Sequence, residues 1–156
     1  FKGNDEAGVT RFASMRGVFD KKGKPFKCDV PGNDKRYGFN IANEESTELV
    51  VFEAAIDLMS YMDIHRDFES NMIALGMVAD APLETFLKEH EVMIAALTLP
   101  KSKATKVAEQ LVDLGIKALW NFAPVDLHFP EEILVENVHL AESIMTLSYR
   151  IHSHNQ

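Results

Sequence analysis

From residue 48 onward, short apolar runs alternate with stretches of helical periodicity, and this rhythm constrains the fold more than any other feature of the chain. The runs predicted to be strands are ELVVF (48–52), MIALG (72–76), VMIAALTLP (92–100), IKALWNF (116–122) and ILVENV (133–138). Strands that alternate with helices form a parallel sheet covered by helices on both faces. The chain is therefore predicted to have an α/β fold.

The segments between these runs have the marks of helices. They are predicted at roughly 53–63, at APLETFLKEH (81–90), at SKATKVAEQLVDLG (102–115) and, last in the chain, at LAESIMTLSYRIH (140–152). In the third helix Val107, Leu111 and Leu114 fall on one face, and Gly115 supplies the usual end signal. In the last helix an apolar stripe of Leu140, Ile144, Leu147 and Ile151 must be buried against some other surface.

Residues 1–47 have a different texture, since they are polar and rich in glycine and turn residues. DKKGKP and VPGNDK are typical of turns between short antiparallel strands. The chain is thus divided into a small β-rich region (1–47) and an α/β domain (48–156).

Composition excludes several classes. A chain of 156 residues with 46% apolar residues can bury one core, and it has no run of ~20 apolar residues that could cross a bilayer. The single cysteine, Cys28, excludes an internal disulfide framework. We expect a cytoplasmic protein with no membrane contact. The net charge of −8 disfavours broad capture of DNA, which leaves only a local basic patch, residues 16–36. Its cations are Arg16, Lys21, Lys22, Lys24, Lys27, Lys35 and Arg36.

Two acids follow the first strand of the α/β domain. Glu53 comes directly after ELVVF, and Asp57 lies four residues later. Ligands of parallel sheets bind beyond the carboxyl ends of the strands, so both acids are candidate site residues. The alternative is that they only stabilise a helix N-terminus, where acids are favoured without any function.

A first resemblance covers residues 10–90. SMRGVFDKKGKPFKCDVPGNDKRYGFNIA, together with LVVFEAAIDLMSY, is similar to Toprim-like domains of mobile-element primases and relaxases. The resemblance implies that Glu53 holds Mg²⁺ or acts in acid–base chemistry on phosphodiesters, with Asp57 beside it. That family also carries an Asp-x-Asp pair after a later strand, whereas residues 92–108 contain no acid. We therefore expect weak Mg²⁺ binding and no catalysis.

A second resemblance covers residues 83–156. GIKALWNFAPVDL and VENVHLAESIMTLSYRI are similar to the C-terminal half of the redox-sensing repressor Rex. The resemblance implies a Rossmann-like sheet that senses NADH against NAD⁺, and a homodimer formed through helix 139–151. The residues that it places along the dinucleotide are Thr98, Leu99, Pro100, Asn121, Phe122, Ala123 and Pro124. The first turn, FEAAID, has no glycine and carries a carboxylate, so we expect weak NAD(H) binding.

These features favour a non-catalytic, DNA-associated regulatory module with a Rex-like, NAD(H)-responsive half that dimerises and a degenerate Toprim-like half. Two alternatives stay open. The first is a Toprim-type, Mg²⁺-dependent enzyme that acts on nucleic acid, and the second is a folded chimera without activity.

Overall fold

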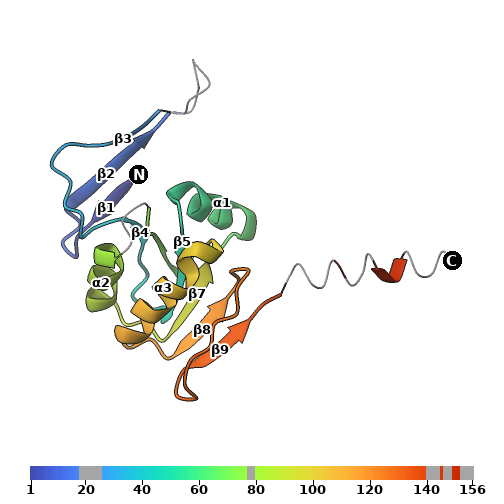
Figure 1. Cartoon of the computed structure of the whole chain (residues 1–156). Helices are drawn as coiled ribbons and strands as arrows, with labels where there is room; N and C mark the ends of the chain where they lie inside the picture. The colour runs from blue at the N-terminus through green and yellow to red at the C-terminus, as the bar shows by residue number, and fades with distance from the viewer. Residues whose placement is uncertain (18–25, 77–79, 140–144, 146–148, 152–156) are drawn as a thin grey trace.

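The structure is a computed structural model that describes residues 1–17, 26–76, 80–139, 145 and 149–151. Within these residues the strands form two sheets, a three-stranded sheet near the N-terminus and a six-stranded sheet that makes up the body of the molecule (Figure 1). None of the helices in the described residues is long and apolar enough to cross a membrane.

The six-stranded sheet has the strand order β4-β6-β5-β7-β8-β9. Its parallel strands are β5 (Glu48–Phe52), β6 (Asn71–Ala74), β7 (Ile94–Thr98), β8 (Ala118–Asn121) and β9 (Leu134–Asn137), and β4 (Phe39–Ile41) pairs antiparallel with β6. Because β5 is buried on both faces and β7 on its α3 side, both strands read in the sequence as nearly continuous apolar runs. The predicted Rossmann-like sheet is confirmed.

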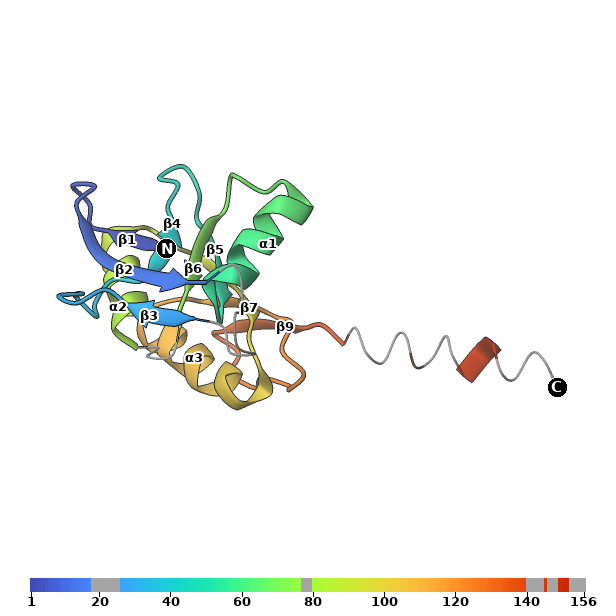
Figure 2. The same ribbon diagram turned by 90° about the horizontal axis from the view of Figure 1, so that it is seen from above.

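Three helices cover this sheet, with α1 (Ala55–His65) on one face and α2 (Asp80–Glu89) and α3 (Lys101–Asp113) on the other (Figure 2). The larger core lies on the α2–α3 side and the smaller on the α1 side. In α3 the buried positions recur with helical spacing, at Ala104, Val107, Ala108 and Leu111. The helix is followed by Gly115, whose positive φ of 100° reverses the chain into β8.

The small sheet contains β1 (Lys2–Asn4), β2 (Thr10–Arg16) and β3 (Lys27–Asp29), all antiparallel. It confirms the predicted antiparallel region ahead of the α/β part. The turn predicted at VPGNDK is present, with Gly32 at φ 86°, while DKKGKP lies outside the described residues. β1 packs on β4, where Phe1 and Phe39 meet edge to face at 5.4 Å, and this contact places the small sheet beside the larger one.

Half of one face of the six-stranded sheet is left uncovered by the described helices. α1 packs over β5 and β6, but Ile94, Trp120 and Leu134 of the next three strands remain 40%, 49% and 70% exposed. With Ala118 they line a hollow of about 340 Å³, which we call the open face. The strand register places these side chains on one side of the sheet together with Glu136, the partner of Trp120, so the open face is largely apolar and carries the Glu136 carboxylate on β9.

The dimer helix predicted at 139–151 falls mostly outside the described residues, including Leu140, Ile144 and Leu147. Its described apolar members, Met145, Tyr149 and Ile151, are exposed. Residues 149–151 are helical and lie away from the body of the domain (Figure 1).

Candidate functional site

The candidate site lies where β5 and β7 end, because the order of the sheet reverses between these two strands. From β5 the chain crosses through α1 to β6 on one side, and then through α2 to β7 on the other. Crossovers that leave in opposite directions open a crevice at the carboxyl ends of the two strands, and ligands of such sheets bind there. Glu53 and Leu99 are adjacent across this crevice, since Phe52 and Thr98 are register partners.

Glu53 forms an ion pair at this point. Its Oε1 lies 2.8 Å from Nζ of Lys103, which stands in the first turn of α3. Lys103 Nζ also approaches the carbonyl oxygen of Gly76 at 3.5 Å. The two side chains are 41% and 34% exposed, so the pair neutralises the crevice while solvent still reaches it. Lys103 was not among the residues singled out from the sequence, although its place one turn after Pro100 could have indicated that it faces Glu53.

Asp57 does not join Glu53 in a carboxylate site. It lies in the first turn of α1 and is exposed, where a carboxylate is stabilised by the helix dipole. Over the described ranges, no group of three His, Cys, Asp or Glu side chains is placed to hold a metal ion. Mg²⁺ prefers several oxygen ligands, and here Glu53 is paired with an ammonium group instead.

The segment Thr98–Pro100 lies along the same edge of the sheet. The Thr98 hydroxyl donates a hydrogen bond to the Val51 carbonyl oxygen at 2.9 Å, and Leu99 is buried in the core. Pro100 is exposed and forms the N-cap of α3. Of the three predicted cofactor-binding residues in this segment, Pro100 therefore has the side chain most open to a ligand.

The segment Asn121–Pro124 is brought next to Thr98–Pro100, since the Phe122 N–H donates to the Leu97 carbonyl oxygen at 3.0 Å. The Asn121 side chain is fully buried and donates to Val125 O at 2.6 Å and to Asn137 Oδ1 at 2.8 Å. Its own Oδ1 accepts the Ala123 N–H at 3.0 Å.

Asn121 is thus committed to holding the loop after β8 in place. Ala123 is buried, while Phe122 is half-buried and packs on Trp120 with ring centroids 4.5 Å apart. Pro124 is exposed. Phe122 and Pro124 are the members of this segment that a ligand in the crevice could contact.

The backbone of the crevice is suited to a diphosphate, whereas the charge of the Glu53 carboxylate is not. α1 has Ala54 at its N-cap with no side-chain cap, so its first N–H groups are not used by a capping side chain. Ala54, Ala55 and Gly76 are small enough for close approach, but the Glu53 carboxylate stands at the same turn. The residues present therefore suit a weakly held dinucleotide, with Lys103 as the available cation.

Comparison with known proteins identifies what the chain resembles. The CoA binding domain family matches residues 43–125, just over half of the chain. The redox-sensing transcriptional repressor Rex of Clostridium botulinum (strain Alaska E43 / Type E3) is 51% identical over 70 residues, 45% of this chain and 33% of that protein. Rex of Thermoanaerobacter sp. (strain X514) is 36% identical over 115 residues, 73% of this chain and 50% of that protein.

Solved structures agree with this similarity. RSP, a Rex-family repressor, superposes with a TM-score of 0.52 at 25% identity over 69% of this chain and 59% of that one. RSP in complex with beta-NAD⁺ and operator DNA gives a TM-score of 0.53 at 27% identity, over 69% of this chain and 57% of that one.

The similarity to Rex proteins extends before residue 83, since the Thermoanaerobacter match spans 73% of the chain, which is more than residues 83–156 contain. The family match from residue 43 crosses residue 83 as well. The chain spans between a third and a half of the length of these curated relatives. The Toprim resemblance of residues 10–90 stays a hypothesis.

Proposed function

Because the chain belongs to the CoA binding domain family, we propose that it is a non-catalytic regulatory module of the Rex type, located in the cytoplasm, that binds a dinucleotide weakly and dimerises. The observation that carries the proposal is the crevice between β5 and β7. It has the backbone of a nucleotide site but holds an ion pair, Glu53–Lys103, in place of a carboxylate cluster.

The dinucleotide would be NAD(H). It supplies a hydride when it reacts, but in a sensor only its binding is used. The uncapped N–H groups of α1 would face its diphosphate, and Lys103 would turn from Glu53 to a phosphate oxygen. Thr98, Pro100, Phe122 and Pro124 would border its other end. The remaining predicted contacts, Leu99, Asn121 and Ala123, would act by shaping the backbone, since their side chains are buried.

Dimerisation would use the open face. Ile94, Trp120 and Leu134 form an apolar surface of a kind that single-domain proteins normally cover. The chain continues beyond β9 with a segment whose described apolar side chains, Met145, Tyr149 and Ile151, are exposed. The most economical arrangement is a two-fold one, in which each subunit's terminal segment 139–151 lies on the open face of the other.

DNA association through residues 16–36 would be weak. Lys35 and Arg36 are already paired with Asp29 and Asp34, both at 2.7 Å, and residues 18–25 lie outside the described part of the chain. Since each unpaired cation neutralises about one phosphate, few contacts are available and salt should abolish them.

Titration with NADH tests the dinucleotide part. With a dissociation constant near 1 mM, 1 mM NADH would stabilise the fold by about 0.4 kcal/mol. That corresponds to a rise of about 1–2 °C in the melting temperature of a domain of this size. NAD⁺ and CoA serve as comparison ligands, and Mg²⁺ serves as the probe of the Toprim alternative. A shift with Mg²⁺ alone, and none with either dinucleotide, would contradict the proposal.

Fluorescence of Trp120 tests the dimer part, because this side chain is the only tryptophan of the chain and is 49% exposed. Its emission should move to shorter wavelength as the concentration rises from about 1 to 100 µM. Tyr149→Glu with Ile151→Glu should abolish the change without unfolding, since both side chains are exposed. Ile64→Glu, at an exposed position of α1, is the matched control. Emission independent of concentration would count against a dimer in which the open face is covered.

A further inference from the structure

A second cavity, of about 250 Å³, lies between the small sheet and the end of the larger one. Strands β2 and β3 and the segment 35–39 form one wall, and the first turn of α1 with the end of β6 forms the other. Most of the first wall lies before residue 43, outside the part of the chain that the family matches. The first wall is therefore a feature of this chain, whereas the other wall lies within the shared domain.

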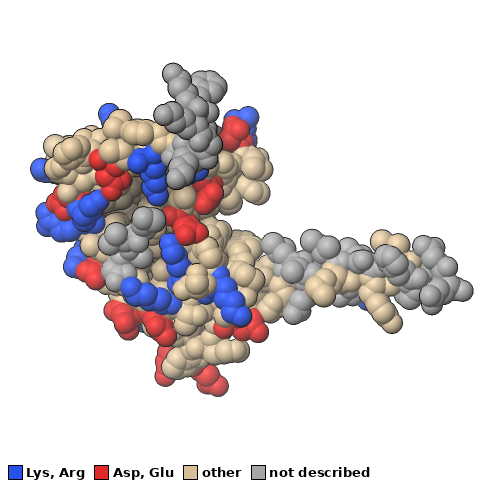
Figure 3. All heavy atoms as spheres, turned by 45° about the horizontal axis from the view of Figure 1, so that its top comes forward, with Lys and Arg blue, Asp and Glu red and all other residues tan. Residues whose placement is uncertain are grey.

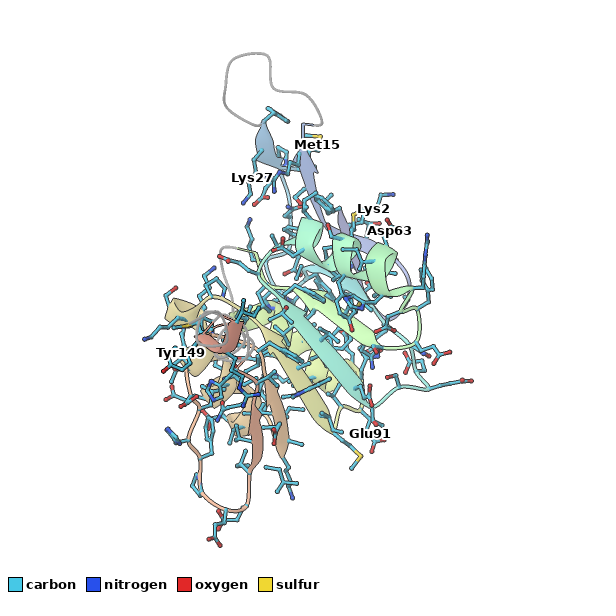
Figure 4. The ribbon with its side chains drawn as sticks, turned by 90° about the vertical axis from the view of Figure 1, so that its right-hand side faces the viewer. Lys2, Met15, Lys27, Asp63, Glu91 and Tyr149 are labelled. Carbon is cyan, nitrogen blue, oxygen red and sulfur yellow. The ribbon has the colours of Figure 1, made fainter. Side chains whose placement is uncertain are left out.

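Two cations on this wall face each other without a counterion. Arg16 of β2 and Lys27 of β3 are direct register partners, and both line the cavity. Like charges on directly opposed strand residues destabilise a sheet. Over the ranges that the structure describes, neither side chain forms an ion pair. Figure 4 shows Lys27 at the upper end of the small sheet, beside Met15.

Three neighbouring cations are paired with aspartates. Arg11, Lys35 and Arg36 each lie 2.7 Å from an aspartate, the partners being Asp5, Asp29 and Asp34. In Figure 3 lysine and arginine side chains are likewise interspersed with acids over the visible face. An anion bound between Arg16 and Lys27 would relieve their repulsion, whereas the Asp29 carboxylate in the same cavity is already held by Lys35.

Aromatic rings stand beside this cation pair. Phe12 and Tyr37 line the cavity and are half-buried, and the Lys35 ammonium lies 5.8 Å from the centroid of the Phe12 ring. Phe39, packed against Phe1, extends the aromatic wall. Rings that are held in place and partly exposed provide stacking surfaces for a planar group. The cavity thus combines an anion site with a stacking site.

We propose that this cavity binds a small phosphorylated aromatic compound of the size of a nucleoside monophosphate, with the phosphate between Arg16 and Lys27 and the ring against Phe12 and Tyr37. Size and charge both favour a small ligand over a nucleic acid strand. The cavity volume of about 250 Å³ is at the small end for ligand sites, and a net charge of −8 repels a polyanion. The opposite wall of the cavity, with Ala54, Ala55 and Gly76, is also the turn that would face the diphosphate of a dinucleotide, so the cavity adjoins the proposed dinucleotide site.

Calorimetric titration of the full chain with AMP tests it, with inorganic phosphate and adenosine as the component probes. AMP should bind more tightly than either component. Arg16→Ala with Lys27→Ala should weaken AMP binding at least tenfold, since two charge-assisted hydrogen bonds are lost. Arg66→Ala with Lys88→Ala removes the same charge from exposed side chains that do not line the cavity, and it should leave AMP binding unchanged. Phe12→Leu should weaken AMP binding but not phosphate binding.

Other outcomes would overturn the proposal. They are no binding of AMP to the folded protein, equal weakening by the two double variants, and tighter binding of single-stranded oligothymidylate than of AMP. Loss of AMP binding in Lys103→Ala, with retention in Arg16→Ala/Lys27→Ala, would place AMP in the crevice between β5 and β7 instead. Failure of NADH to bind would leave this proposal intact, because Arg16, Lys27 and Phe12, which would hold AMP, are not among the residues proposed to hold the dinucleotide.

Discussion

The variant Glu53→Gln distinguishes a dinucleotide site from a Mg²⁺ site in the crevice between β5 and β7, because the two hypotheses predict opposite changes in ligand affinity. The Glu53 carboxylate lies 2.8 Å from Lys103 and stands at the turn where a diphosphate would lie. If the crevice holds a dinucleotide, the carboxylate repels the ligand and pairs with Lys103, which could otherwise contact a phosphate. Its removal should therefore strengthen NADH binding. If the crevice holds Mg²⁺, the Glu53 carboxylate coordinates the ion, and its removal should abolish Mg²⁺ binding.

The size of the effect follows from Coulomb's law. A unit charge about 6 Å from a phosphate, at an effective dielectric constant of about 40, contributes about 1.4 kcal/mol of repulsion. That is about a tenfold change in the dissociation constant. The fold itself should be little affected, since a pair with both partners more than a third exposed contributes at most about 1 kcal/mol.

Isothermal titration with NADH at about 50 mM salt measures the change directly, and Lys103→Ala is the companion variant that should weaken binding. Raising the salt to about 0.5 M should shrink both effects, because exposed charges are screened. Weaker NADH binding in Glu53→Gln, or Mg²⁺ binding that disappears in the same variant, would refute the reasoning.

Three further predictions concern the fold. Leu97→Ala removes a fully buried side chain between the sheet and α3, so it should lower the free energy of unfolding in guanidinium by about 2–5 kcal/mol. The control Ile64→Ala, at an exposed position, should lower it by less than ~0.5 kcal/mol, and equal losses would contradict the assigned core. A methyl group at Gly3 would overlap the Gly38 carbonyl, so Gly3→Ala should speed amide hydrogen exchange in residues 1–17, whereas the control Lys2→Ala should not. Unchanged exchange in Gly3→Ala would show that β1 does not pack on the segment around Gly38. Acid should weaken the fold below about pH 4, because two carboxyl groups have lowered pKa values. The Arg36 side chain lowers the pKa of Asp34 from 3.8 to about 2. Burial raises the pKa of Asp67, but backbone hydrogen bonds from Ser70 and Glu69 outweigh it and hold that pKa below 3.8. Carboxyls with lowered pKa values stabilise the folded state above their unfolded pKa and lose that contribution as the pH falls through the folded pKa, so a urea midpoint that rose between pH 5 and pH 2.5 would contradict this assignment.

The larger part of the fold could be predicted from sequence because its cause is local. β5 is buried on both faces and β7 on the face toward α3, so each strand is an apolar run. α3 buries one face, so its apolar residues recur at helical spacing. β4 was harder to predict, since a strand of three half-buried residues that joins a distant edge carries no comparable local signal.

The site was predictable only in its position. Parallel strands bring their carboxyl ends to one edge, so Glu53, Thr98 and Asn121 could be expected near each other. The Glu53–Lys103 pair joins residues 50 positions apart, and only the place of Lys103 one turn after Pro100 indicates it in the sequence. Asn121 illustrates the same limit. As a residue type it suits ligand binding, but its amide is consumed by Val125, Asn137 and Ala123 within its own loop.

The mass of the protein in solution tests the central claim most directly. The account predicts a homodimer, because an open face that contains Ile94, Trp120 and Leu134 needs a cover and the terminal segment 139–151 offers one. Light scattering at about 10–100 µM should give twice the 17.5 kDa of one chain, and Tyr149→Glu with Ile151→Glu should return it to the mass of a folded monomer. A mass of 17.5 kDa for the unmodified protein over this whole range would contradict the account.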